Sequence, residues 1–253
     1  LSPYNGVTNI NQRKALIMTK QLRAGIIYRG ASQIDGLPIV AIATYSDRNT
    51  KTGKVLQTYI IRSDMSPLEA SKSGQDFSIC ANCVFRGIAN SDPKRKQAKN
   101  RKCYVNLGQG PTVVYKSFIR GVYPITNDHA SRVELGKNRV VRLGTYGDPA
   151  AVPSHIWDEL LTECESHLAY THQSGFRPDI TMQSADTLAQ AQAHWAKRAR
   201  TFRVIDSLAD IDKANEILCP ASKEAGRRVQ CVKCQLCSGL TSNSKKSIAI
   251  VEH

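Results

Sequence analysis

The chain has 253 residues, 41% of them hydrophobic and 22% charged, which is the composition of a globular protein large enough to bury a core. It has no apolar run of the roughly 18 residues that a membrane span needs, and its start does not resemble a secretory signal. We therefore expect a cytoplasmic protein of a bacterial or phage-infected cell. Lys and Arg outnumber Asp and Glu by 35 to 21, and the net charge of +14 favours an anionic partner, nucleic acid or a nucleotide, over a basic surface without a dedicated ligand.

The N-terminal region, residues 1–74, predicts a helix followed by a β-hairpin. Residues 11–27 are expected to form the helix, which is basic. Residues 38–45 and 55–61 are rich in β-branched side chains and flank a polar connection that contains Asn and Gly. This pattern is typical of two antiparallel strands.

Strands and helices alternate in the main domain, residues 75–253, which also carries the cysteine groups described below. One helix is predicted to begin after the N-cap Ser66. Four others are predicted at residues 111–122, 153–164, 187–199 and 210–217. Strands are predicted at residues 140–143, 167–171, 180–183, 201–205 and 247–251. This alternation indicates right-handed βαβ units and a parallel sheet. The expected fold class is α/β, with the βα units forming a partial or complete TIM-like barrel.

Four cysteines near the end of the chain, Cys219, Cys231, Cys234 and Cys237, have the spacing C-x11-C-x2-C-x2-C. Four thiolates in a compact loop suit either tetrahedral Zn²⁺ or a [4Fe–4S] cluster. The run C-x2-C-x2-C is more typical of cubane clusters than of zinc sites built from two separate C-x2-C pairs. These residues are predicted metal ligands, which agrees with a reducing compartment better than disulfides would.

A second group, Cys80, Cys83 and Cys103, has the spacing C-x2-C-x19-C and supplies only three ligands. A closed zinc site would need a fourth ligand from elsewhere in the chain. The candidates for that ligand are Cys164, His129, His167 and His172. A three-cysteine [4Fe–4S] cluster would instead leave one iron open to a co-substrate. Both alternatives remain open from the residues alone.

A basic segment lies between the second and third cysteines of this group. Its cations are Lys94, Arg95, Lys96, Lys99, Arg101 and Lys102. A cationic loop held at both ends by metal ligands is suited to contact the phosphate backbone of DNA or RNA. Runs of charge are also often only solvated, so the segment predicts nucleic-acid binding without establishing it.

Polar residues follow each predicted strand of the main domain. Ligands of parallel α/β folds bind at the carboxyl ends of the strands, where these residues would gather. We predict catalytic roles for Asp148, His172 and Asp206. We predict cofactor-binding roles for Gly144, Thr145, Gly147 and Ser184, since glycine lets the backbone approach a ligand closely. The competing interpretation is that strands end in polar residues because loops are polar.

The chain resembles radical S-adenosylmethionine proteins in its layout. The resemblance covers about residues 75–253 and rests on the cysteine triplet, the Gly-Thr-Tyr-Gly-Asp-Pro strand end and the C-terminal cysteine-rich loop within a run of βα units. It implies that Cys80, Cys83 and Cys103 ligate a [4Fe–4S] cluster and that S-adenosylmethionine is the co-substrate. The chain is also similar to uncharacterised phage- and mobile-element-encoded proteins with Tyr-Gly-Asp-Pro and Tyr-Thr-His-Gln segments, and this likeness implies no known activity.

The leading hypothesis is an iron–sulfur, radical S-adenosylmethionine-type enzyme that acts on nucleic acid or a nucleotide. The alternative from another class is a zinc-stabilised nucleic-acid-binding protein of a phage or mobile element, with no catalytic metal. A third hypothesis is a barrel enzyme whose catalytic site is metal-free and whose zinc only fastens loops.

Overall fold

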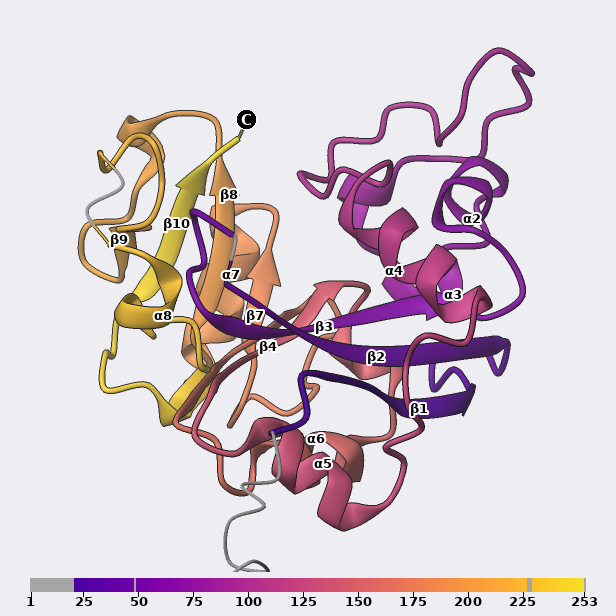
Figure 1. The fold of residues 1–253 in the computed structure, drawn as a ribbon. Helices are drawn as coiled ribbons and strands as arrows, with labels where there is room; N and C mark the ends of the chain where they lie inside the picture. Colours follow the sequence, from indigo (N-terminus) through magenta and orange to yellow (C-terminus); the bar gives the residue numbers. More distant parts are fainter. Residues whose placement is uncertain (1–20, 48, 227–228, 253) are drawn as a thin grey trace, which may run out of the picture.

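The computed structural model describes residues 21–47, 49–226 and 229–252, which have a mixed α/β fold (Figure 1). The strands form two five-stranded sheets. The first has the order β1 (Ala24–Ala31), β2 (Pro38–Ser46), β3 (Val55–Arg62), β4 (Val140–Tyr146) and β5 (Ser166–Leu168). The second has the order β6 (Tyr170–Thr171), β7 (Met182–Ala185), β8 (Thr201–Ile205), β10 (Ser247–Val251) and β9 (Glu216–Leu218). No pairing between these described strands closes a barrel.

The first sheet is antiparallel at one edge and parallel at the other. Strands β2 and β3 form the predicted antiparallel hairpin, which is confirmed, and β3 then pairs in parallel with β4 and β4 with β5. The prediction of a helix at residues 11–27 is wrong where the structure describes it, since residues 24–27 belong to β1 and pair with β2. Residues 11–20 lie outside the described residues. Ile27 is fully buried in β1, and such β-branched residues suit a paired strand.

The second sheet is parallel throughout, as the alternating pattern predicted. The strand predicted at residues 167–171 is divided into β5 and β6 by Ala169 alone. The amide of Ala169 donates to the carbonyl of Cys237 at 2.7 Å, and its carbonyl accepts from the amide of Met182 at 2.9 Å. The two sheets therefore adjoin at this residue, and a single chain segment takes part in both.

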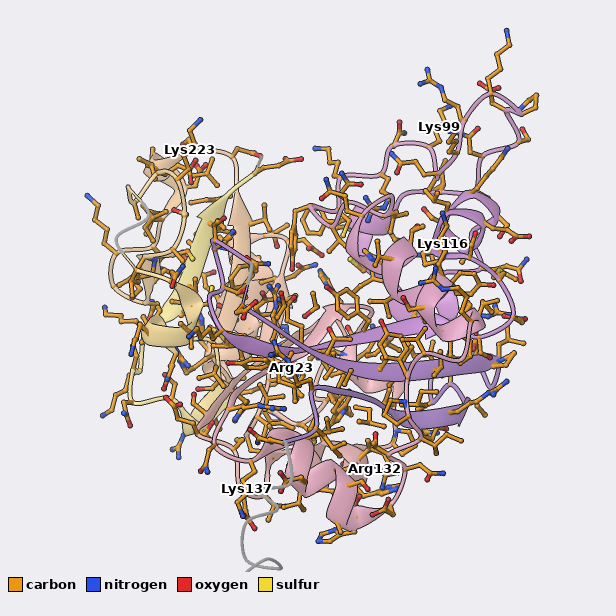
Figure 2. The ribbon with its side chains drawn as sticks, in the orientation of Figure 1. Arg23, Lys99, Lys116, Arg132, Lys137 and Lys223 are labelled. Carbon is orange, nitrogen blue, oxygen red and sulfur yellow. The ribbon has the colours of Figure 1, made fainter. Side chains whose placement is uncertain are left out.

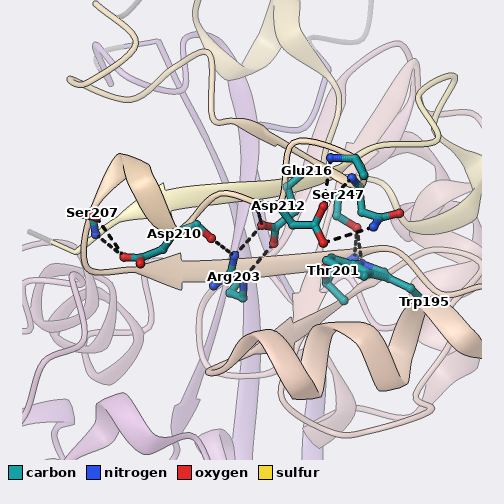
Figure 3. A network of polar contacts seen from close by, with 10 residues as sticks. Trp195, Thr201, Arg203, Ser207, Asp210, Asp212, Glu216 and Ser247 are labelled. Atoms are coloured by element: carbon teal, nitrogen blue, oxygen red, sulfur yellow. Dashed lines mark hydrogen bonds and ion pairs between the residues drawn. The ribbon is translucent and has the colours of Figure 1, made fainter.

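The prediction of a helix at residues 210–217 is wrong, because the 3₁₀ turn η3 (Leu208–Asp210) ends at the first of these residues and strand β9 begins at Glu216. Arg203 of β8 and Glu216 of β9 form an ion pair at 2.6 Å, with both side chains buried (Figure 3). Arg203 also donates to the carbonyl of Asp210 at 2.7 Å. Two charges removed from water require such direct pairing, and the strand conformation brings Glu216 to Arg203.

The helices flank these sheets. They are α2 (Pro67–Ser73), α3 (Phe77–Cys80), α4 (Gly110–Ile119), α5 (His129–Gly136), α6 (Ser154–Leu161), α7 (Leu188–Ala196) and α8 (Cys231–Cys234). Helices α2, α4, α6 and α7 begin within one residue of their predicted starts, whereas α3, α5 and α8 were not predicted. Ser66 caps α2 as predicted, accepting from the amide of Glu69. Helices α5 and α6 cover one face of the first sheet, where Trp157 and Leu160 are fully buried in the same cluster as Leu143 of β4. No helix among the described residues combines the length and the apolar character that crossing a membrane requires.

Candidate metal centres and strand-end site

The cysteine triplet lies in the long connection that follows the carboxyl end of β3. Cys80 ends α3, Cys83 precedes the turn η1 (Val84–Arg86), and the amide of Cys103 donates to the carbonyl of Phe85 at 2.9 Å. This bond holds the segment of Cys103 against the turn that directly follows Cys83. Burial, and then the nearby Asp76, Cys83, Cys103 and Asp148, raise the pKa of the Cys80 thiol well above its ordinary value. The three thiols therefore share one neighbourhood.

Asp148, a predicted catalytic residue, is buried and fully engaged in hydrogen bonds. Its Oδ1 accepts from Thr171 Oγ1 at 2.6 Å and from the amide of Ala150, and its Oδ2 accepts from the amide of His172 at 2.8 Å. Its own amide donates to the carbonyl of Ile79. Burial raises the pKa of Asp148, while these hydrogen bonds oppose that rise. Asp148 thus ties α3 and the end of β6 to the end of β4, which supports a positioning role.

His172 follows β6 and lies beside the triplet. Its Nε2 is 3.4 Å from Asp186 Oδ1, and its ring meets that of Phe85 edge-on at 6.1 Å. Burial lowers the pKa of His172, but contacts with Asp186 and Cys83 outweigh it and raise the pKa to about 10.

The other candidates for a fourth ligand have different surroundings. His167 Nε2 lies 3.0 Å from the carbonyl of Ile180, His129 faces Glu159, and Cys164 follows α6. Among the described residues, His172 is the candidate whose pKa is influenced by a cysteine of the triplet, Cys83.

Buried polar atoms without a hydrogen-bond partner gather at the carboxyl ends of β4 and β6. Among the described residues they are Thr145 Oγ1, Tyr146 Oη and Gln173 Nε2, whereas His172 Nε2 and Asp186 Oδ1 face each other at 3.4 Å as an ion pair. Leaving such a group unpaired costs about 1–3 kcal/mol, and native proteins keep few of them. Tyr146 also lies near Cys80 and Cys103, which together with burial raise the pKa of its hydroxyl. This edge therefore has the character of a ligand site.

The remaining predicted strand-end residues contribute less to this site. Gly144 (φ 65°) and Gly147 (φ 84°) adopt left-handed conformations, and a Cβ would come within 2.5 Å of the Gly147 carbonyl or 2.7 Å of Ile60 Cβ, respectively. These glycines let the loop fold against its own chain rather than against a ligand. Ser184 is half-buried in β7, whereas Asp206 is exposed beyond β8.

The C-terminal cysteines face a common cavity of about 30 Å³. Its lining includes Cys219, Cys231, Cys234, Cys237, Arg142 and Tyr170. The amides of Cys231 and Val232 donate to the carbonyls of Lys51 and Thr52, which dock α8 on the connection between β2 and β3. Cys231 and Cys237 also pack with Val55 and Val140, the first residues of β3 and β4. This group therefore lies toward the amino ends of the strands whose other ends face the triplet.

All eight cysteines are free thiols. Among the described residues, no three or more His, Cys, Asp or Glu side chains lie in an arrangement that could hold a metal ion. The four C-terminal thiols nevertheless line one cavity, and the three thiols of the triplet influence one another. Neither group therefore has a closed set of metal ligands among the described residues, although the C-terminal thiols surround one cavity.

Two buried arginines flank the four-cysteine cavity. Arg142 of β4 donates through Nη2 to the hydroxyls of Tyr170, at 2.6 Å, and Tyr104, while its Nε has no partner. Arg200 donates to backbone carbonyls, including those of Leu236 and Gly239 in the cysteine loop. Within the described residues neither guanidinium forms an ion pair with a carboxylate. Burial lowers the pKa of Arg142, but the hydroxyls of Tyr104 and Tyr170 and two cysteines of the cavity together raise it.

The basic segment projects from the body of the protein as a loop. The backbones of Ile88 and Lys99 hydrogen-bond to each other in both directions and close its base, and Figure 2 shows Lys99 on this projection. Lys94, Arg95, Lys96 and Lys99 are exposed. The remaining two predicted contacts, Arg101 and Lys102, already have partners within the protein. Arg101 donates to the carbonyls of Cys103 and Val105, and Lys102 pairs with Glu252 at 3.0 Å.

The residues that sequence reasoning missed are Arg142, Arg200 and Tyr104. A charged residue inside the apolar run Val140-Val141-Arg142-Leu143 is a signal that could have identified the first, whereas the other two have no local signature. Comparisons of the chain with family models, characterised proteins and solved structures found no match, so the chemistry has to be argued from these residues themselves.

Proposed function

We propose that this protein is an iron–sulfur enzyme that acts on nucleic acid or a nucleotide, with a cluster on Cys80, Cys83 and Cys103. The observation that carries the proposal is the position of this triplet. Its thiols influence one another beside strand ends that hold buried, unpartnered polar atoms. The carboxyl ends of parallel strands are where ligands of α/β proteins bind.

A partial βα barrel is the finer fold that we infer. Strands β3, β4 and β5 are parallel neighbours, and so are β6, β7, β8 and β10. Because β5 and β6 are separated by Ala169 alone, the two sets follow one another around a common surface. This order supports the resemblance to radical S-adenosylmethionine proteins.

Each part of the site has a task in this proposal. A [4Fe–4S] cluster with three cysteine ligands would leave one iron to bind S-adenosylmethionine and supply radical chemistry. Asp148 would hold α3, and with it Cys80, at the strand ends. Thr145, Tyr146 and Gln173 would orient the bound molecules through their unpartnered polar atoms.

We propose that the C-terminal cysteines form a second metal centre. Four thiolates around Zn²⁺ or a [4Fe–4S]²⁺ core leave two net negative charges, which are costly to bury without compensation. Arg142 and Arg200 are buried and without a carboxylate partner among the described residues, and both are influenced by Cys237. The two positive charges would neutralise the two negative ones.

The zinc-stabilised nucleic-acid-binding protein remains the second candidate, because two observations favour it. The four-cysteine cavity of about 30 Å³ is closer in size to a single ion than to a cube of iron and sulfur. His172 beside Cys83 could complete a three-cysteine, one-histidine zinc site. Both cysteine groups would then be structural.

Metal analysis separates these candidates. Protein purified anaerobically should be brown, show broad visible absorption and contain iron and sulfide. The Cys103→Ala variant should lose the iron of the triplet and any radical activity while it keeps its fold by circular dichroism. Cys164→Ala is the matched control and should lose neither. The zinc-stabilised protein would be supported, and the iron–sulfur enzyme rejected, by two results together. The unaltered protein would be colourless with about two zinc ions, and the Cys103→Ala variant would be insoluble.

A further inference from the structure

A second cavity, of about 360 Å³, adjoins the cysteine triplet. It is lined by Gln33, Ile34, Phe77, Ala81, Asn82, Ala150, Gln173 and Phe176. Ala81 and Asn82 are the two residues between Cys80 and Cys83, and Gln173 follows β6 at the strand ends. The volume falls within the range of about 300–1,000 Å³ that is typical of small-molecule sites. The cavity is therefore large enough for a heterocycle and lies next to the proposed chemistry.

The lining defines the chemistry of its occupant. It contains no charged side chain, so it offers nothing to neutralise a phosphate or a carboxylate. It combines two phenyl rings, Phe77 and Phe176, with the carboxamides of Gln33, Asn82 and Gln173. Carboxamides present a donor and an acceptor side by side and pair with the edges of bases, whose flat faces stack on aromatic rings. An acyl chain would leave the amides unpaired, and a sugar alone would make little use of the rings.

Two details sharpen this picture. Gln173 lines the cavity and its Nε2 has no hydrogen-bond partner, so a rotation of its carboxamide would let an acceptor of the occupant pair with it. Phe77 remains 37% exposed, and the guanidinium of Arg86 lies 5.6 Å from its ring centroid. The cation contacts one part of the ring and leaves other parts able to stack with a base.

The loop of exposed cations is part of the same connection. Cys83 ends the pocket-lining turn, and the base of the loop begins at Ile88. A nucleic acid whose phosphates contact Lys94, Arg95, Lys96 and Lys99 would be anchored close in sequence to this turn. Phosphates and base would thus be recognised by separate, chemically distinct parts of one segment.

We propose that this cavity binds a single nucleobase, unstacked from a single-stranded nucleic acid. The inference builds on the proposed function in naming the part of the substrate that is recognised. Extruding one base to reach it is the general solution of enzymes that act on nucleotides within a strand.

The test uses the anaerobically purified full chain. Saturation-transfer NMR should detect adenosine, guanosine, cytidine or uridine binding through base protons, and ribose 5-phosphate should not compete. Gln173→Leu should weaken nucleoside binding about fivefold through the lost hydrogen bond, and Phe77→Leu about tenfold through lost stacking. Gln109→Leu, an exposed glutamine outside the cavity, is the matched control and should bind normally. If Gln173→Leu does not fold, Asn82→Leu replaces it, because Asn82 is exposed.

Absence of nucleoside binding, or equal binding by Gln173→Leu, Asn82→Leu and Phe77→Leu, would overturn the inference. Labelled oligonucleotides supply a second readout, since one abasic position should weaken binding only if a base enters the cavity. Iron is measured on the same samples. Base binding by an iron-free protein would keep this inference and reject the enzyme, whereas an iron-loaded protein without base binding would do the reverse.

Discussion

Arg142 shows how one side chain connects the two cysteine groups. It contacts Tyr104, the neighbour of Cys103, through its guanidinium, and it lines the cavity of the four C-terminal cysteines. A guanidinium keeps its charge when buried, so its placement requires negative charge nearby. In the proposed second metal centre that charge comes from the thiolates.

Replacing Arg142 with methionine should therefore weaken metal retention at the C-terminal group. Groups that surround metal ligands typically change metal affinity by about 10- to 100-fold, and we expect a loss of this size. The measurement is the metal remaining after a timed chelator challenge. Arg142→Lys keeps the charge and should retain an amount of metal between that of Arg142→Met and that of the unaltered protein. Arg29→Met, at an exposed arginine, should retain as much metal as the unaltered protein. Unchanged retention by Arg142→Met would contradict the charge argument.

At the scale of elements, strand β5 lies at the edge of the first sheet, next to the second, and carries a histidine that must stay neutral. His167 is buried, and burial lowers its pKa below the ordinary value of 6.5; the carbonyl of Ile180 and nearby Asp179 partly oppose this shift, and Arg177 adds to it. The unfolded chain takes up this proton near pH 6.5, while the folded chain resists it. Stability is therefore full above pH 6.5 and falls as the pH drops below that value.

Denaturation midpoints measured between neutral and mildly acidic pH test this expectation. The denaturation midpoint should decrease as the pH is lowered. The decrease should be smaller for His167→Gln, because the glutamine amide does not titrate. His194 also has a lowered pKa, through burial and then Lys197, so a residual pH dependence is expected in the variant. His129→Gln, at an exposed position, should behave like the unaltered protein. Equal slopes for His167→Gln and the unaltered protein would show that His167 is not responsible.

The sequence predicts elements well where their signals are local. The cap at Ser66, the β-branched hairpin and the βα alternation after residue 139 are set by neighbouring residues, and the corresponding elements form. Segments 24–27 and 210–217 were mispredicted because their partners are distant. Residues 24–27 form part of strand β1 by pairing with β2. In residues 210–217, the ion pair between Glu216 and Arg203 favours a strand over a helix.

The same limit applies to the candidate site. Cysteine spacing predicts two groups of metal ligands, and the strand-end rule points to Asp148 and His172. The sequence does not reveal that the hydrogen bonds of Asp148 suit positioning, that Asp206 is exposed, or that two arginines accompany the C-terminal thiols. These properties depend on residues far apart in the sequence and are fixed only when the sheets assemble.

At the scale of the whole molecule, the net charge of +14 is spread over many elements, so the issue is whether the projecting loop binds nucleic acid specifically. We expect its exposed cations to dominate, because they stand together on a segment without neighbouring carboxylates other than Asp92, which lies 3.9 Å from Arg95. Replacing Lys94, Arg95, Lys96 and Lys99 with glutamine should weaken binding to single-stranded DNA and RNA. The slope of log affinity against log salt should fall by about 3, since each phosphate contact on a single strand contributes about 0.7 to it.

A matched variant decides whether position or total charge matters. It replaces an equal number of exposed lysines on other elements, namely Lys197, Lys213, Lys223 and Lys245. Both variants lose the same charge, so long-range attraction falls equally, but only the loop variant removes the proposed phosphate contacts. Fluorescence anisotropy at several salt concentrations should therefore show a larger loss of affinity and slope for the loop variant. Equal losses would mean that the basic surface acts as a whole, and the loop would then have no special role in binding.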